Sequence, residues 1–574
     1  MNLLFLYFLF IKFSAVLSQV KKINSFNKLY ENMDGIIMAY GDFNLDNMED
    51  LVLYNPYNNT ISIYTQNNDD NVNTVFEFYT KIELPHQEKV IGIIAIDLNT
   101  DFYLDIICTF KNENLNNFYV YMGNADNDFQ INHTILDIHD EPFVFDYLAK
   151  YKLHLLLNKG NYSILWSEGL FIKRTDLVPS LRHSHGFADI YVMVIKFYLD
   201  LIFTTKAGFT VYSFKDEYTD EVFKGLYPPK CKNCKCDFSY VDTNSNSQID
   251  IICGYIFNNE NYISIFNFED KTWSDQKIEV NINKERALFA KEGGIEVLRF
   301  ADYNLDGFID FLTVVETENK EMHVALFSNK LGYNLKKDVK RTDRAIFEHD
   351  AKYNLQNLDD LNIVRAAFID SQEDGNLDVI VSYQNSENHL YKSVVYEFNR
   401  QPDGTFIHIK AFFTENDKHH SKMFPPVAPG VTITYSLQNL YDYQRGGKAT
   451  QLSKTGHSTL SIKYTAFGLG PSPNFVDKIV VGLCRISNNY VKRERVQIIP
   501  NSKNIVIINP RMKPELWKFR LFLKTSSEFY YTAILFSVIF TIFGIVASML
   551  YLLEKRQDKQ DMLNRANVFH FDAM

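Results

Sequence analysis

FADYNLDGFIDFL, residues 300–312, places oxygen-bearing side chains at every second position of a short loop. Counted from Asp302 as position 1, positions 3, 5 and 9 are Asn304, Asp306 and Asp310, and position 6 is Gly307. This spacing is typical of the first part of a calcium loop, because alternate side chains of a tight turn converge on one cation. The residues around the loop decide which kind of protein carries it.

The same pattern recurs along the chain, which indicates a repeat protein. Four further copies are GDFNLDNMED, IDLNTDFYLD, VDTNSNSQID and IDSQEDGNLD. Their candidate metal ligands are Asp42, Asn44, Asp46 and Asp50; Asp97, Asn99, Asp101 and Asp105; Asp242, Asn244, Asn246 and Asp250; and Asp370, Gln372, Asp374 and Asp378. Two decayed copies begin at Asp146, with His154 at the ninth position, and at Asp189, which is followed by apolar residues and Asp200. The seven first acids are between 43 (146 to 189) and 68 (302 to 370) residues apart.

Each loop is followed by a short apolar run that is typical of a β-strand. The runs are LVLY, IICTF, LLL, LIFTT, IICGY, FLTVV and VIVSY. An EF-hand would need flanking helices and a Glu at position 12, which here is Thr313, inside a strand. Each loop is therefore expected to join two strands, and seven such units predict a mainly β, seven-bladed propeller over residues 19–424. A β-solenoid is the structural alternative, although its repeats are normally shorter.

The cofactor expected in these loops is Ca²⁺, which takes six to eight oxygen ligands. The loop at 302–310 fits best, and 370–378 comes next because Gly375 occupies position 6, where the turn favours a positive φ. Asn47 tolerates that conformation at the same position of its loop, whereas Phe102 is strained there. The loop at 242–250 has only two acids and is expected to bind weakly. The role would be structural, and the alternative is a solvated Asp/Asn turn with no ion.

Composition separates this chain from nucleic-acid-binding proteins. Its 574 residues are too many for one ordinary hydrophobic core, so several domains or a repeat array are expected. The formal net charge is −11, which argues against nucleic acid as a partner.

Both ends of the chain carry membrane-targeting signals. Residues 1–18 read as a signal peptide, with a buried N-terminal strand as the alternative. The run from Phe529 to Leu553 has no charged residue and is long enough to span a bilayer. Together they predict a single-pass type I membrane protein with an extracellular or lumenal ectodomain. Sequons at Asn58, Asn132 and Asn161 agree with that topology.

Three further segments complete the domain plan. Residues 425–525 contain β segments that predict a small antiparallel sandwich next to the membrane. The cytoplasmic tail, 554–574, is either disordered or a docking signal for a cytosolic partner. The motif CKNCKC, with Cys231, Cys234 and Cys236, predicts one local disulfide in an oxidising compartment; zinc binding is the alternative.

Several motifs resemble a known family. EVLRFADYNLDGFIDFL and IVRAAFIDSQEDGNLDVIV resemble the FG-GAP repeat of integrin α-subunit propellers. FGLGPSPNFVDKIVVG (467–482), IIPNS (498–502) and FHFDAM (569–574) look like the T-cell immunomodulatory protein family, also called LINKIN. The resemblance covers essentially the whole chain, although repeats 3 and 4 depart from the pattern. It implies cell adhesion or surface signalling through an extracellular protein ligand, and no catalytic activity.

A glycan-binding or glycan-processing propeller is the alternative function. It would need a polar, aromatic-lined pocket at the mouth of the ring. The sequence contains no G-x-S-x-G motif, phosphate loop or spaced Glu pair, so an enzyme is not expected.

Overall fold

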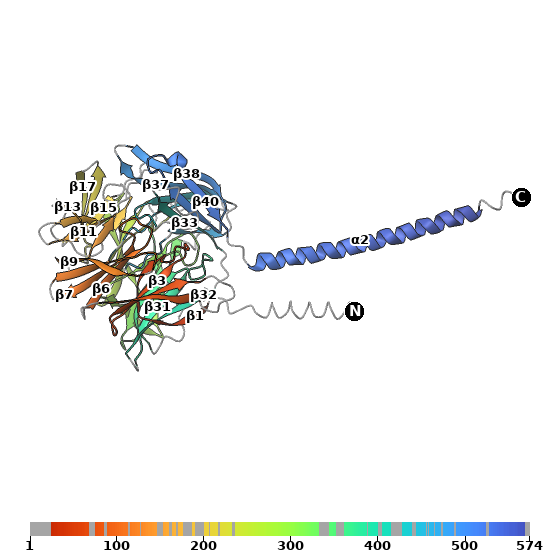
Figure 1. Ribbon diagram of the computed structural model, residues 1–574. Helices are drawn as coiled ribbons and strands as arrows, with labels where there is room; N and C mark the ends of the chain where they lie inside the picture. Colours follow the sequence, from red (N-terminus) through yellow and green to blue (C-terminus); the bar gives the residue numbers. More distant parts are fainter. Residues whose placement is uncertain are drawn as a thin grey trace. The chain divides into compact units, whose positions relative to one another are not determined.

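A computed structural model describes residues 25–568 with internal gaps. The gaps are 68–74, 85–88, 113–114, 127, 140, 146–152, 160–162, 168–169, 176–185, 190–199, 206, 216–217, 232–235, 332–343, 352–360, 387–388, 400–403, 415–426, 439–443, 455, 457–458, 464, 472–474, 487–488 and 524–526. The fold is mainly β, with one long C-terminal helix (Figure 1). Residues 1–522 form one compact unit and residues 523–574 a second.

Each repeat forms one antiparallel sheet. Repeats 1 to 3 comprise β2 (Ile36–Gly41), β3 (Asp50–Asn55), β4 (Thr60–Gln66) and β5 (Phe76–Glu83); β6 (Lys89–Ile96), β7 (Asp105–Asn112), β8 (Leu115–Met122) and β9 (Gln130–Ile138); and β10 (Phe143–Phe145), β11 (His154–Asn158), β12 (Ser163–Ser167) and β13 (Leu170–Thr175). Repeats 4 and 5 comprise β14 (Gly186–Ala188), β15 (Asp200–Thr204), β16 (Gly208–Lys215) and β17 (Tyr218–Leu226); and β18 (Phe238–Val241), β19 (Asp250–Phe257), β20 (Glu260–Asn267) and β21 (Thr272–Ile278).

Repeats 6 and 7 vary this arrangement. Repeat 6 comprises β22 (Asn281–Ile282), β23 (Glu285–Phe289), β26 (Arg299–Ala301), β27 (Asp310–Thr317), β28 (Met322–Asn329) and β29 (Phe347–His349), with the small hairpin of β24 (Lys291–Glu292) and β25 (Ile295–Glu296) inserted. Repeat 7 comprises β30 (Asn362–Ile369), β31 (Asp378–Gln384) and β32 (Tyr391–Asn399). Its fourth strand is β1 (Ser25–Asp34) from the other end of the unit, which pairs antiparallel with β32.

Each acidic loop joins two strands of one sheet, as the sequence predicted. The ninth-position acid is the first residue of the strand that follows the loop in each of the five intact repeats; these acids are Asp50, Asp105, Asp250, Asp310 and Asp378. A strand, and no helix, follows each loop, so the EF-hand alternative is excluded by the structure as well.

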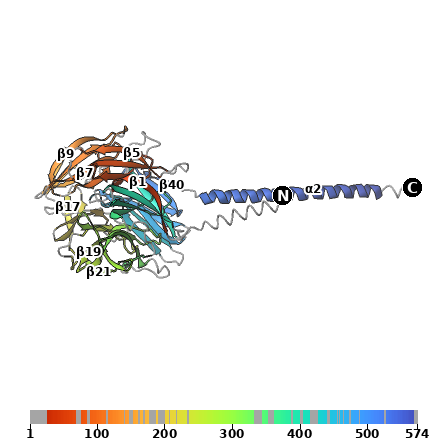
Figure 2. The same cartoon turned by 90° about the horizontal axis from the view of Figure 1, so that it is seen from below.

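Neighbouring sheets pack on one another in sequence order. Repeats 1 and 2 share a hydrophobic core, as do repeats 2 and 3, 4 and 5, 5 and 6, and 6 and 7. Repeats 3 and 4 meet through the rings of Phe143 and Phe187, whose centroids are 5.6 Å apart. The last sheet packs on the first, because Ala367 and Ile380 share a core with Ile37 and Leu51. The arrangement is therefore propeller-like, and Figure 2 shows strands of repeats 1 and 2 on the opposite side from β19 and β21.

A buried ion cluster ties three inner strands together. Both terminal nitrogens of the Arg299 guanidinium, Nη1 and Nη2, donate to the Glu292 carboxylate, at 2.6 and 2.7 Å. Arg365 donates to the same carboxylate at 3.1 Å and to Ile37 O at 2.8 Å. Arg299 also donates to Ala366 O at 2.9 Å. These charge-assisted hydrogen bonds connect repeats 6, 7 and 1. No sequence motif predicted them.

The C-terminal β domain consists of two four-stranded sheets. One is β36 (Thr465–Pro471), β33 (Gly404–Phe413), β39 (Ser502–Ile508) and β40 (Lys518–Phe522), and the other is β35 (Gln444–Thr450), β34 (Thr432–Gln438), β37 (Val476–Ile486) and β38 (Asn489–Ile498). Apolar side chains of both sheets share one core with Trp517, which follows the 3-10 turn Pro514–Leu516.

One feature of this domain differs from the expected antiparallel sandwich. Strand β33, which starts at Gly404, hydrogen-bonds to β36 and β39. The β33–β39 pair is parallel, so the domain is not purely antiparallel. A run of apolar residues shows that a strand is present, but it does not show which sheet the strand joins.

Helix α2 (Ser527–Val568) contains the apolar run 529–553 and continues for fifteen residues into the expected tail (554–568). It is long and apolar enough to cross a membrane. The expected signal peptide, residues 1–18, and the terminal FHFDAM lie outside the described residues.

Candidate metal-binding loops

Every intact loop is closed by the carboxylate at position 1. In the loop at 302–310, Oδ1 of Asp302 accepts from Asp306 N at 3.2 Å and Oδ2 accepts from Gly307 N at 2.8 Å. The acids at position 1 of the other loops, Asp42, Asp97, Asp242 and Asp370, accept from positions 5 and 6 in the same way, at 2.8–3.2 Å. The five loops therefore share one backbone conformation.

Positions 3 and 5 point their oxygens into the same turn. Asn304 Oδ1 accepts from Asp306 N at 2.9 Å, and Asp306 Oδ1 accepts from Phe308 N at 2.9 Å. The position-5 residues Asp46, Asp101, Asn246 and Asp374 each accept from the N–H of position 7, at 2.7–2.9 Å. At position 3, Asn44 and Asn99 repeat the Asn304 hydrogen bond, at 3.2 and 3.1 Å, and Asn244 is buried. Gln372 occupies position 3 of the last loop.

Two residues of each loop have positive φ angles. Position 6 is left-handed as predicted, at Asn47, Phe102, Ser247, Gly307 and Gly375, with φ between 65° and 90°. Position 4 is left-handed too, at Leu45, Thr100, Ser245, Leu305 and Glu373, with φ between 51° and 62°. The sequence did not predict the second set, because none of these residues is Gly. Two left-handed residues in a three-residue span curl the chain, so that the N–H groups of positions 5 and 6 reach the position-1 carboxylate.

The ninth-position acids are buried beneath the turns. Asp310 is fully buried; its Oδ1 accepts from Asn329 N at 2.8 Å, and its Oδ2 has no hydrogen-bond partner among the described residues. Oδ1 of Asp250 is likewise without a partner in the described part of the chain. A buried carboxylate oxygen without a donor is costly unless a cation or a proton satisfies it.

The electrostatics of the loops favour a positive partner. Burial, and then the Asp306 charge, raise the pKa of Asp302 well above its usual value. Burial, and then the Asp306 and Asp302 charges, do the same to the pKa of Asp310. Burial together with nearby acids raises the pKa of Asp242 and of Asp370 to about 8. Carboxylates with such pKa values bind protons at neutral pH unless a cation compensates their charge.

Calcium fits this donor set better than a transition metal does. Within the described residues, no three His, Cys, Asp or Glu side chains form a group able to hold a metal by themselves. The loops instead mix carboxylate, amide and backbone oxygens, which are the hard ligands that Ca²⁺ prefers and supplements with water. The unpartnered Oδ2 of Asp310 is the observation that supports this fit. The loops at 302–310 and 242–250 each contain such an oxygen.

The decayed repeats differ from the intact ones. Asp146 lies outside the described residues, and His154, in its repeat, is buried in β11. Asp189 and Asp200 are both buried, and the Lys448 ammonium lies 2.9 Å from Asp189 Oδ2. Repeat 4 thus places a lysine from the C-terminal β domain beside its first acid.

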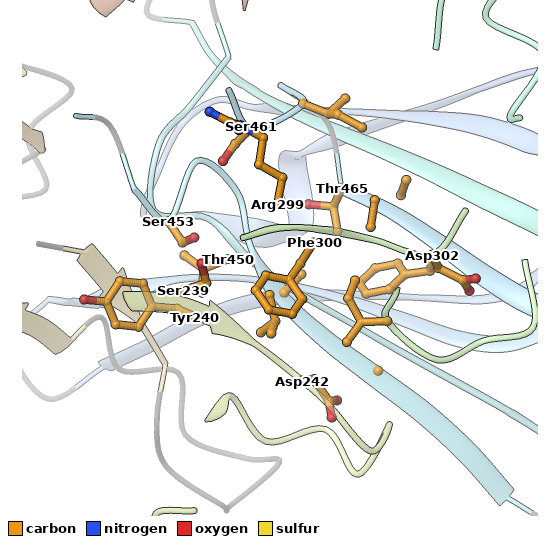
Figure 3. Close-up of a pocket in the computed structure, with 18 of the residues that line it drawn as sticks. Ser239, Tyr240, Asp242, Arg299, Phe300, Asp302, Thr450, Ser453, Ser461 and Thr465 are labelled. Atoms are coloured by element: carbon orange, nitrogen blue, oxygen red, sulfur yellow. The ribbon is translucent and has the colours of Figure 1, made fainter. Parts of the chain in front are cut away.

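A cavity of about 200 Å³ lies between repeats 5 and 6 and the C-terminal β domain. Figure 3 shows Asp242, Asp302, Arg299 and Tyr240 around Phe300 in its wall, which also includes Ser453, Ser461, Thr450 and Thr465. Its lining combines polar and aromatic residues with aliphatic ones such as Val297, Leu298 and Ile462. Its volume is below the roughly 300–1,000 Å³ of typical ligand pockets, so it gives the glycan alternative little support.

The structure describes two of the three cysteines of the CKNCKC motif. Cys231 is disulfide-bonded, while Cys234 lies outside the described residues. Cys236 is a buried free thiol whose sulfur lies 3.6 Å from that of Cys231.

Comparison with known proteins gives the family. The FG-GAP-like repeat profile matches residues 42–108, and the profile described as ITFG1, C2 domain, matches residues 423–522. The T-cell immunomodulatory protein of Macaca fascicularis is 30% identical over 288 residues, which are 48% of this chain and 90% of that protein. The chain belongs to the T-cell immunomodulatory protein family.

Other members of the T-cell immunomodulatory protein family align along nearly the whole chain. The human protein is 24% identical over 585 residues, 94% of this chain and 92% of its own. The homolog of Plasmodium yoelii yoelii is 24% identical over 640 residues, 92% of this chain and 89% of its own. The resemblance inferred from the FG-GAP and C-terminal motifs is thereby confirmed. Drosophila Semaphorin 1b aligns with a TM-score of 0.30 at 9% identity, over 65% of this chain and 88% of that one. This similarity is too low to support an inference about function.

Proposed function

We propose that this member of the family is a single-pass type I protein of the cell surface, whose calcium-stabilised ectodomain binds protein partners in adhesion or signalling. The ectodomain is a seven-bladed propeller followed by a β-sandwich. The sheet-to-sheet packing, which returns from repeat 7 to repeat 1, supports the ring. Helix α2 supports the membrane anchor.

The proposal of calcium binding is supported by the repeated loop geometry and by the carboxylate oxygens of Asp310 and Asp250 that have no hydrogen-bond partner among the described residues. Five loops place a position-1 acid, a position-5 oxygen and a ninth-position acid in the same arrangement. A Ca²⁺ ion held by these residues would cancel the repulsion among the acids and fix each turn. Affinities of about 0.1–1 mM are usual for extracellular modules of this kind, which suits the calcium level outside the cell.

Binding of the isolated ectodomain to intact cells tests the proposal. The compact unit ending at Phe522 is labelled and added to cells in about 1 mM calcium or in chelator. We expect saturable, calcium-dependent binding that mild protease treatment of the cells removes. Asp310→Asn should weaken it, whereas Glu318→Gln, at an exposed position outside the loops, should not.

Two outcomes would contradict the proposal. Binding that survives protease but disappears after enzymatic removal of glycans would favour the lectin-like alternative. Absence of saturable binding to every adherent and lymphoid cell type tested would exclude a surface protein partner.

A further inference from the structure

The C-terminal β domain lies directly on the loop side of the repeats. Strand β35 alone contacts three of them. Arg445 donates to Asp306 O at 3.2 Å in repeat 6, and the backbone N–H of Lys448 donates to Asp242 Oδ2 at 3.1 Å in repeat 5. The ammonium of the same lysine pairs with Asp189 in repeat 4. One strand of the C-terminal β domain therefore contacts three consecutive repeats.

The FGLG segment, residues 467–470, approaches the best calcium loop even more closely. Gly470 N donates to Leu305 O at 3.0 Å. A Cβ atom on Gly468 would lie 1.9 Å from Asp302 Oδ2, which no real side chain permits. The glycines of this segment thus let the domain touch the position-1 acid of this loop.

Repeats 7 and 1 are covered in a similar way. The Lys503 ammonium lies 2.6 Å from Glu373 Oε2, and Lys410 donates to Asn47 O at 2.5 Å. The backbone N–H of Lys463 donates to Glu49 Oε1 at 2.5 Å. The loop at 97–105 is different: its acids accept hydrogen bonds from their own repeat, and Asp101 is exposed.

The kind of contact differs between intact and decayed repeats. In repeat 4, apolar residues stand at positions 3 and 5, and a buried ammonium pairs with the position-1 carboxylate itself. In repeat 6, Arg445 donates to a backbone carbonyl of the loop and its guanidinium stacks over the Phe308 ring at 4.7 Å. In repeat 7, Lys503 pairs with Glu373 at position 4, which is not a ligand position. A lysine thus pairs with the position-1 carboxylate in repeat 4, where the other metal ligands are lost, whereas Arg445 and Lys503 contact the loops of repeats 6 and 7 away from their side-chain ligands.

We propose that calcium in the loops at 242–250 and 302–310 holds the C-terminal β domain against the repeats, with Lys448 as the permanent counter-charge in repeat 4. This inference rests on the calcium part of the proposed function. The physical reason is that Leu305 O, Asp306 O and Asp242 Oδ2 keep their positions only while the turns are closed. By linkage, docking in turn strengthens calcium binding in the covered loops and leaves the loop at 97–105 unaffected.

Amide hydrogen exchange of the full chain in detergent tests the coupling. Peptides covering 444–450 and 465–471 are followed in millimolar calcium and in chelator, with β37 as the internal reference. We expect chelator to speed exchange of the two docking segments about tenfold and to leave β37 unchanged. Asp310→Asn should give fast exchange at 465–471 even in calcium. Asp105→Asn, the same substitution at the same position of the uncovered loop, should alter only peptides of repeat 2.

The two proposals fail in different ways. If calcium raises the melting temperature but leaves exchange at 444–450 and 465–471 unchanged in the unmodified protein, calcium binds and the coupling is wrong. If calcium alters neither the melting temperature nor the exchange rates, both the proposed calcium binding and the proposed coupling are wrong. Equal loss of protection in Asp310→Asn and Asp105→Asn would also overturn the coupling, because the described residues of the C-terminal β domain contact the loop at 302–310 and not the loop at 97–105.

Discussion

At the scale of single residues, left-handed backbone explains most of what distinguishes the five loops. Position 6 carries the larger φ angles, and the two strongest calcium candidates place Gly there, with φ of 90° at Gly307 and 89° at Gly375. Phe102 holds φ at 79° in the loop at 97–105, so the strain expected from the sequence is present. Such a conformation costs an L-residue about 1–2 kcal/mol, which calcium binding or packing must offset.

Substitution of these two glycines should separate backbone strain from packing. Gly307→Ala adds a Cβ whose nearest neighbours lie at 3.4 Å or beyond, so we expect a loss of about 1–2 kcal/mol from the backbone alone. In Gly375→Ala the Cβ would lie 2.2 Å from the Phe406 ring, which adds roughly 1–3 kcal/mol of overpacking. Urea unfolding of both variants measures the difference. Equal losses would show that Phe406 moves aside without cost.

At the scale of elements, the strands that join distant parts of the chain are the ones whose place was hardest to predict. Strand β1 completes the sheet of repeat 7, more than three hundred residues away, in a register that pairs Ser25 with Asn399 and Asp34 with Lys392. Strand β33 joins the C-terminal β domain although it follows repeat 7 directly. In both cases the edge that a strand covers is set by the neighbouring sheet.

Removal of β1 should open the ring. A chain that begins at Gly35 leaves the β32 edge unpaired, and we expect a melting temperature lower by several degrees and association into oligomers. A chain that begins at Ser25 is the matched control and should behave as the full ectodomain does. Differential scanning calorimetry and size-exclusion chromatography provide the two readouts. An unchanged melting temperature in the shorter chain would mean that β1 adds nothing to closure.

At the scale of the whole molecule, the buried acids set the response to pH and calcium together. Burial is the first cause of the raised pKa values in every loop, and neighbouring acids contribute to most of them. The pKa is about 6 at Asp42, about 7 at Asp97, Asp105, Asp250 and Asp378, and about 8 at Asp242 and Asp370. The unfolded chain has the ordinary Asp value, near 3.9. Between about pH 4 and 8 the metal-free folded state therefore binds more protons than the unfolded state does.

Stability in chelator should fall as pH rises through that window. The sign follows from linkage, since the free energy of unfolding decreases with pH wherever the folded state holds the extra protons. Calcium needs the deprotonated acids, so its stabilising effect should grow over the same range. Melting temperatures at pH 5 and pH 8, with calcium and with chelator, measure both effects. Asp370→Asn should reduce the slope in chelator, and a melting temperature in chelator that is independent of pH would refute the argument.

The sequence by itself determined the repeats, the strand after each loop, the family and the candidate ligands. These are local properties, because spacing along a few residues decides whether oxygens can converge and whether a segment favours a strand. Only the tertiary structure decided that position 4 is left-handed at residues such as Leu305, that Lys448 pairs with Asp189, and that FGLG rests on Asp302. The last two contacts join residues that are 259 (189 to 448) and 166 (302 to 468) positions apart, and no local spacing encodes such a distance.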